Sequence, residues 1–180
     1  MHKTIVTIPA TVEPVTLAEA KAQLRLEDSF TLDDAFINDL ISAARDRVES
    51  YCNRFFTEQS ILISWDEPFP VGEIDLPYPD LAAVTSVQYV ADNTLNTVDP
   101  ADYYVDLVRQ KITGTFPTAD NYRVSATTSA PTELSGVKQA ILMIVTDLYE
   151  LRTESVVASS VTNNPAVKAQ LYPYRVNLGI

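Results

Sequence analysis

The sequence predicts an α+β fold in which a mostly helical core carries an inserted β-rich section. Apolar residues recur at helical spacing through residues 36–55, and a second helical pattern starts near residue 132. Between them, residues 59–128 change to short β-prone runs broken by Pro, Gly, Asn and Asp. A chain of 180 residues with 46% hydrophobic content fits a single domain, residues 1–180, that buries roughly two thirds of its unfolded surface.

The N-terminal arm precedes a short helix. Pro9 and Pro14 keep the arm extended, as a strand or as a strap without regular pairing. Its apolar residues occur at both parities, so the pattern does not decide which side of the arm faces the core. Thr16 and Glu19 stand three apart in a capping-box pattern, which predicts a short helix through about Leu26.

A longer helix follows, and Thr31 is placed to cap it. Asp33 and Asp34 then fall in its first turn, where carboxylates favour the positive end of the helix. Arg45 and Glu49 are four residues apart, which is the spacing of an ion pair on a helix surface. The helix carries one continuous apolar stripe. Its members are Phe36, Ile37, Leu40, Ile41, Ala44, Val48, Tyr51, Cys52 and Phe55.

The β-rich section holds several short runs of strand-forming residues between turn signals. Pro68, Pro70 and Gly72 separate the first two runs, and Asp92 begins a turn after the third. The predicted strands are Ser60–Trp65, Glu73–Leu76, Val84–Ala91, Tyr103–Leu107 and Tyr122–Thr127.

Helix returns near Thr132 and continues to about Arg152. Residues 140–145 are apolar on every side, so this helix is buried all round, either in its own domain or by another subunit. A Ser/Val/Asn linker follows, and Pro165 starts a last short helix through about Leu171. The predicted sections are 16–56 (helical), 59–128 (β-rich insertion), 132–152 (helix), 153–164 (linker) and 165–180 (C-terminal docking segment).

The formal net charge is −11, and it is spread unevenly. Residues 61–130 carry three basic and ten acidic residues, whereas residues 131–180 carry four of each. An acidic chain gains nothing from counterion release, which argues against tight phosphate binding. Two readings stay open: the charge serves solubility, or it forms a surface that lies near a polyanion without binding it.

The sequence lacks the residue sets that common catalytic and metal sites need. His2 is the only histidine and Cys52 the only cysteine, which argues against His-based triads, disulfides and cysteine-rich zinc sites. Four glycines cannot build a phosphate-binding loop. The carboxylates Asp33 and Asp34 suit helix-dipole stabilisation better than acid–base work. We therefore expect no catalytic residue, no cofactor and no metal, and we expect Cys52 to be a small buried hydrophobe.

No apolar run approaches the roughly 20 residues that a bilayer span needs. The first residues also lack the apolar core of a secretory signal. We therefore expect no membrane partner.

Several segments, taken in chain order, carry patterns that occur together in one family. They are Pro14–Leu26, Asp34–Ile37, Leu40–Arg45, Val48–Arg54, Ile74–Pro77, Val84–Tyr89, Val137–Leu142, Leu148–Arg152 and Leu171–Arg175. In this order they resemble the head–tail connector (head-completion adaptor) proteins of tailed double-stranded DNA phages. The chain departs from the family at Leu151, where a polar residue is common, and at Gly136, where a helix former is usual.

The resemblance implies a structural, non-enzymatic subunit of the virion neck. Such proteins form a ring, commonly of about twelve copies, beneath the portal protein. The ring extends the DNA channel and presents a docking surface for a neck, stopper or tail protein. Double-stranded DNA is then expected to pass through without specific binding, and assembly is expected in the host cytoplasm.

Two sets of residues are predicted to make these contacts. For the subunit interface we expect residues of the two long helices, because a ring needs apolar surface on each subunit. They are Phe36, Leu40, Ile41, Ile141, Leu142, Met143 and Ile144. For portal docking we expect the C-terminal segment, which follows the linker and carries aromatic anchors. Its residues are Leu171, Tyr172, Tyr174 and Arg175.

Two other functions remain alternatives. A different neck or tail-completion protein of a phage particle would share the acidity and the missing active site. A small acidic enzyme domain would instead show a pocket with converging carboxylates.

Overall fold

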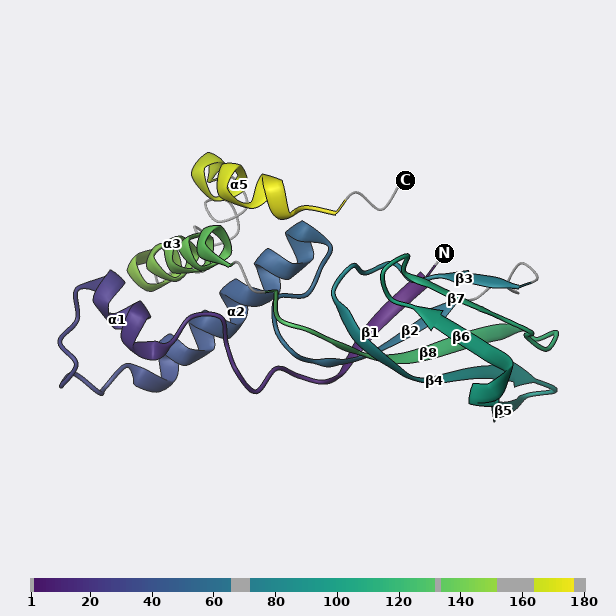
Figure 1. The fold of residues 1–180 in the computed structure, drawn as a ribbon. Helices are drawn as coiled ribbons and strands as arrows, with labels where there is room; N and C mark the ends of the chain where they lie inside the picture. Colours follow the sequence, from purple (N-terminus) through teal and green to yellow (C-terminus); the bar gives the residue numbers. More distant parts are fainter. Residues whose placement is uncertain (1, 66–71, 132–133, 152–163, 177–180) are drawn as a thin grey trace. The chain divides into compact units, whose positions relative to one another are not determined.

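The computed structural model describes residues 2–65, 72–131, 134–151 and 164–176 (Figure 1). The chain divides into two compact units. The β unit comprises residues 1–11 and 57–130, and the helical unit comprises residues 12–56 and 131–180. The α+β class is therefore confirmed. A mostly helical core is not confirmed, because the structure is 36% helical and 31% strand.

Within the described residues of the helical unit, four α-helices share one apolar core. They are α1 (Leu17–Leu24), α2 (Asp34–Cys52), α3 (Ser135–Leu151) and α5 (Pro165–Leu171), and the short 3-10 helix η2 (Tyr172–Tyr174) follows. Helix α3 packs against α1, α2 and α5 (Figure 1). The core draws on the predicted stripe of α2, including Ile37, Ala44 and Val48, and on Val137 and Val145 of α3.

Local capping sets the helix ends. Thr16 Oγ1 accepts from the Glu19 amide at 3.2 Å, and Glu19 Oε2 accepts from the Thr16 amide at 2.7 Å, so the predicted capping box is confirmed. Arg25 takes the left-handed conformation, with φ 59°, and ends α1 at Leu24, which is two residues earlier than predicted. The predicted cap at Thr31 is wrong: α2 begins at Asp34, and its N-cap is Asp33.

The physical reason for the shift is a turn before α2. The Asp34 amide donates to the Thr31 carbonyl at 3.3 Å, so the backbone of Thr31 is used in that turn. Asp34 still lies in the first turn of α2, as the sequence indicates. At the other end of the helical unit, Pro165 and Leu171 bound α5 as predicted, with Asn164 as its N-cap. The rest of the predicted linker lies outside the described residues.

The part of the β unit that the structure describes forms two antiparallel sheets. The five-stranded sheet has the order β1-β2-β8-β4-β5, and the three-stranded sheet has the order β3-β7-β6 (Figure 1). The strands are β1 (His2–Ile8), β2 (Ser60–Trp65), β3 (Glu73–Asp75), β4 (Leu81–Ala91), β5 (Thr94–Thr97), β6 (Tyr103–Asp106), β7 (Lys111–Gly114) and β8 (Asn121–Thr128), with the 3-10 helix η1 at Pro100–Asp102.

All five predicted strands are present, and β5 and β7 were missed. Both are only four residues long and at least half of the residues in each are polar, so neither shows a clear period of two. Asp92 and Asn93 both have positive φ, at 49° and 61°, and join β4 to β5 in a two-residue hairpin turn. The N-terminal arm proves to be a strand, because β1 pairs with β2.

Each sheet buries one face and leaves the other outside. Ile61, Ile63 and Val124 of the larger sheet are fully buried, and so are Ile74 and Ile112 of the smaller one. Their neighbours along each strand point the opposite way, because side chains alternate along a strand. The β unit therefore has a core between apolar faces and two distinct outer faces.

Candidate functional site

The residues predicted for the subunit interface lie along α2 and α3 of the helical unit. Ile41, Ile141 and Ile144 are buried in the core of that unit. Leu40, Leu142 and Met143 are partly buried against the same core. Phe36 is 39% exposed, and its ring lies 6.2 Å from that of Tyr149. The apolar run of residues 140–145 is thus largely covered within its own unit.

The four residues predicted for portal docking differ in exposure. Leu171 is buried in the helical core, whereas Tyr172 is 74% exposed. Tyr174 is partly buried, with its ring edge-on to Phe56 at 6.2 Å. Arg175 is exposed and places its guanidinium 5.4 Å from the centre of the Tyr51 ring. Tyr172 and Arg175 therefore present the accessible part of this set.

Backbone contacts tie the chain after α5 to the end of α2. The Val176 amide donates to the Cys52 carbonyl at 2.8 Å, and Asn53 Nδ2 donates to the Val176 carbonyl at 3.2 Å. Arg54 Nη1 donates to the Tyr174 carbonyl at 3.4 Å. Asn53 can serve in this way because it ends α2 in the left-handed conformation, with φ 52°. The C-terminal segment is consequently held on the helical unit.

The structure shows why position 136 is a glycine and not the helix former that the resemblance predicts. A Cβ atom at this position would lie 2.9 Å from Cε2 and 3.0 Å from the hydroxyl oxygen of Tyr174. Those distances are shorter than van der Waals contact, so a larger residue would displace the ring. The glycine lets Tyr174 lie directly against α3.

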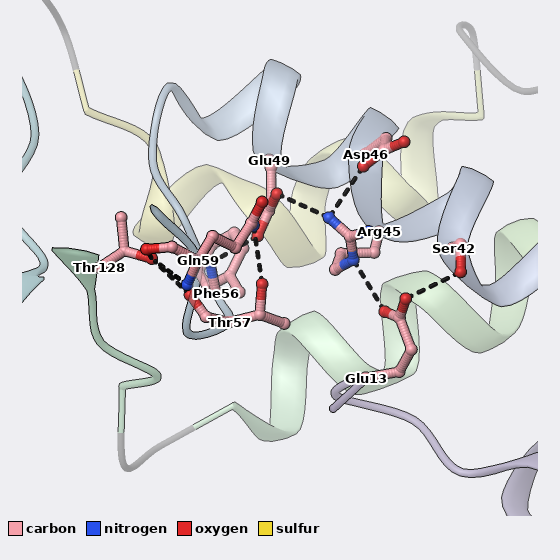
Figure 2. A network of polar contacts seen from close by, with 9 residues as sticks. All are labelled: Glu13, Ser42, Arg45, Asp46, Glu49, Phe56, Thr57, Gln59 and Thr128. Atoms are coloured by element: carbon pink, nitrogen blue, oxygen red, sulfur yellow. Dashed lines mark hydrogen bonds and ion pairs between the residues drawn. The ribbon is translucent and has the colours of Figure 1, made fainter. Parts of the chain in front are cut away.

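A charge network around the buried Arg45 joins the strap before α1 to α2 (Figure 2). Arg45 is 6% exposed, and its Nε donates to Glu13 Oε2 at 2.8 Å. Its Nη1 lies 2.8 Å from Asp46 Oδ1 and 3.1 Å from Glu49 Oε2. Burial alone would lower the pKa of Arg45, but the hydrogen bond to Glu13 and the surrounding carboxylates raise it.

Two carboxylates of this network, Glu13 and Glu49, also accept a second hydrogen bond. Glu13 Oε1 accepts from the Ser42 hydroxyl at 2.8 Å, and Glu49 Oε1 accepts from the Phe56 amide at 2.8 Å. The predicted pairing of Arg45 with Glu49 is confirmed, but its predicted place on the helix surface is wrong. Both side chains are buried, and Glu13, which is distant in sequence, accepts a hydrogen bond from Arg45. The four-residue spacing could predict the pairing of Arg45 with Glu49 but not the contact of Arg45 with Glu13.

A smaller buried polar set belongs to the β unit and is drawn in the same view (Figure 2). The Thr128 hydroxyl accepts from the Gln59 amide at 2.9 Å and donates to the Thr57 carbonyl at 2.7 Å. The Thr128 amide donates to the Gln59 carbonyl at 2.9 Å. These hydrogen bonds pair backbone groups at the start of β2 and the end of β8, so their role is structural.

The reactive side chains offer little chemistry. Cys52 is buried as predicted, and burial raises the pKa of its thiol to about 11, despite the opposing charges of Arg54 and Arg175. His2 packs near Trp65 and Tyr78, and burial lowers its pKa. Among the described residues, no group of three or more His, Cys, Asp or Glu side chains could hold a metal ion.

One hollow lies at the β4–β5 hairpin, and it contains two carboxylates. It is lined by Ala91, Asp92, Thr118, Ala119 and Asp120. None of these residues is a histidine, cysteine or lysine that could act as a base or nucleophile beside the carboxylates. No described helix is both long and apolar enough to cross a membrane.

The comparisons with known proteins agree with the resemblance. Residues 14–78 match the family of phage gp6-like head-tail connector proteins. No curated protein matches the sequence. The match covers residues 14–78, so it extends the resemblance from the sequence patterns to this part of the chain.

Solved neck structures extend the likeness to the whole chain. The chain is similar to one from the neck of an empty gene transfer agent (GTA) particle with C6 symmetry, with a TM-score of 0.71 and 20% identity. A chain of the virion of a native GTA particle gives a TM-score of 0.68 and 20% identity. A chain of the neck of a native GTA particle with C12 symmetry gives a TM-score of 0.66 and 19% identity. Each likeness covers 98% of this chain and 96% of the other, so the fold is shared along nearly its entire length.

Proposed function

We propose that the chain is a ring subunit of a head–tail connector. The ring lies beneath the portal protein in the virion neck, extends the DNA channel and offers a docking surface to the next neck, stopper or tail protein. The observation that carries this proposal is the family match over residues 14–78, together with the shared fold of the GTA neck chains. The C6 and C12 symmetries of those particles support a ring of about twelve copies.

The helical unit supplies the first proposed contacts. Phe36, Leu40, Leu142 and Met143 keep part of their apolar surface outside the core of their own unit. They are therefore the members of the predicted interface that can still reach a neighbouring copy. Ile41, Ile141 and Ile144 support them from within the core.

The C-terminal segment supplies the proposed portal contact. Tyr172 and Arg175 are exposed on a backbone that is hydrogen-bonded to the end of α2. An exposed tyrosine and an arginine are residue types that dominate many protein interfaces. Leu171 and Tyr174 anchor the segment, so the contact is presented on a fixed base.

Charge supports passage of DNA without specific binding. The net charge of −11 gives a ring of about twelve copies a large net negative charge, which repels a polyanion. The proposed assembly site is the host cytoplasm, where newly filled capsids would receive the ring.

The test mixes the purified full chain with filled, tailless capsids that carry a portal. The expected result is saturable binding of about twelve copies per particle, visible as a ring at one vertex by electron microscopy. A Tyr172→Ala/Arg175→Ala variant should bind at least about tenfold more weakly, whereas the matched surface variant Gln23→Ala/Arg47→Ala should bind as the parent does. Binding to isolated tails but not to portal-bearing capsids would assign the chain to another neck or tail-completion role. Turnover of a small molecule at the hollow beside Asp92 would assign it to the enzyme class.

A further inference from the structure

The outer face of the five-stranded sheet differs in charge from the rest of the β unit. The β unit contains eleven acidic and four basic residues, yet strands β1, β2, β4, β5 and β8 contain no Asp or Glu. The pairing registers place Lys3, Ser64, Arg123, Gln88 and Thr97 directly opposite one another across all five strands. Tyr122 and Val124 flank Arg123 and are buried, so this row lies on the outer face.

Lys3 and Arg123 are the two cations of that row. Neither makes an ion pair with any described residue, unlike Lys111, which lies 2.8 Å from Glu73. Ser64 stands between them, so they are two strand spacings, or about 10 Å, apart. The next row on the same face contains Ile5, which is 47% exposed, and Leu62.

The outer face of the three-stranded sheet carries the opposite charge at the same spacing. Asp75, Lys111 and Asp106 lie opposite one another across β3, β7 and β6. Ile74 and Ile112 are buried on the other side, so this row is also outside. The two aspartates are again two strand spacings, or about 10 Å, apart. Lys111 between them lies 2.8 Å from Glu73 and 3.6 Å from Asp75, and Arg109 Nε lies 3.8 Å from Asp106 Oδ2. Glu73, Asp75 and Asp106 outnumber these two cations, so the face keeps a net negative charge.

An aromatic side chain continues the match in the neighbouring row. Tyr104 is 70% exposed and lies two residues from Asp106 along β6, just as Ile5 lies two residues from Lys3 along β1. If Asp106 faces Lys3, then Tyr104 faces Ile5 and Asp75 faces Arg123. One superposition of the two faces thus satisfies both charges and the apolar contact.

We propose that the three-stranded sheet of one copy stacks on strands β1, β2 and β8 of the next copy, with Asp106 and Asp75 against Lys3 and Arg123 and Tyr104 against Ile5. The two faces differ, so each contact is head-to-tail, and repetition of such a contact closes a ring when the rotation between successive copies adds up to a full turn. The inference rests on the proposed ring function and adds a contact surface in the β unit to the one proposed on α2 and α3.

Crosslinking of the full chain tests the pairing directly. The Ile5→Cys/Tyr104→Cys variant, treated with a short bismaleimide crosslinker, should give a ladder of covalent multimers, because Cys52 is buried and does not react. Mixing the two single variants should give only dimers that contain one of each. Crosslinking within either single variant alone, or no ladder in solution and on portal-bearing capsids, would overturn the inference.

A charge swap in the same cysteine background tests the ion pairs. Arg123→Glu and Asp75→Arg should each reduce the ladder about tenfold, because each change turns an attraction into a repulsion. A mixture of the two variants should restore it, since every contact in an alternating ring again joins opposite charges. Arg47→Glu, an exposed charge reversal on α2, is the matched control and should have no effect.

Failure of this inference can be told from failure of the proposed function by measuring capsid binding on the same samples. An unchanged ladder in both swapped variants overturns the β-unit contact even where portal binding persists. If portal binding is lost while the crosslinked ladder and its rescue by the charge swap persist, the connector role is contradicted. The contact between β units is then still supported. Loss of duplex DNA binding in Arg123→Glu with an unchanged ladder would assign the row to nucleic acid and overturn the proposal.

Discussion

The ring of Tyr174 occupies the space that a side chain at Gly136 would need, with Cε2 only 2.9 Å from the position of the missing Cβ. Gly136 lies in the first turn of α3, and Tyr174 lies in η2. The C-terminal segment therefore packs closely on α3 because this one position has no side chain.

Gly136→Ala should lower the free energy of unfolding in the parent but raise it in a Tyr174→Ala background. Alanine favours helix over glycine by up to about 1 kcal/mol, and only the contact with Tyr174 opposes that gain. Thermal and urea unfolding of the four variants of this double-mutant cycle measure the coupling. Equal effects in both backgrounds would show that the packing of the Tyr174 side chain does not depend on Gly136.

Arg45→Met should destabilise the chain by about 3–5 kcal/mol, because the buried carboxylate of Glu49 and the half-buried carboxylate of Glu13 lose their shared cation. The matched variant Arg47→Met changes an exposed arginine on the same helix and should stay within about 0.5 kcal/mol of the parent. Urea unfolding measures both. Similar small effects for the two variants would contradict a buried role for Arg45.

The Cys52 thiol should be unreactive toward a water-soluble disulfide reagent at pH 8 in the folded chain and fully reactive in urea. Burial raises its pKa from the ordinary value of 9.0 to about 11, so it stays protonated in the folded state. The raised pKa contributes stability that is present below pH 9 and is lost as the pH rises through 11. Cys52→Ala should remove this part of the alkaline loss. Rapid labelling of the native chain would argue against the burial.

Thr16→Ala should cost about 1 kcal/mol, because it removes the hydroxyl that accepts from the Glu19 amide at the start of α1. Gln23→Ala, at an exposed site on the same helix, is the control and should be within about 0.5 kcal/mol of the parent. The Thr16 amide also donates to the Glu19 carboxylate, and this second hydrogen bond lowers the pKa of Glu19. The stability that comes from the lowered pKa is present above the ordinary carboxyl pKa and fades as the pH falls. Unfolding curves at pH 7 and pH 3 check both statements.

Much of the secondary structure could be predicted from local patterns. The stripe of α2, the capping box at Thr16 and the proline at the start of α5 each depend on neighbours within a few residues. The cap at Thr31 failed because a turn uses its backbone, and β5 and β7 were missed because four residues show no clear period.

The sequence by itself determined where most helices and strands form, since helix spacing, caps and strand alternation are local properties. It also determined the acidity of the chain and the scarcity of histidine, cysteine and glycine. Only the tertiary structure decided that Glu13 covers Arg45, that Tyr174 lies on Gly136, and that Lys3 shares a row with Arg123. These relationships join residues far apart in the chain, and they arise from strand register and core packing, which no local pattern specifies.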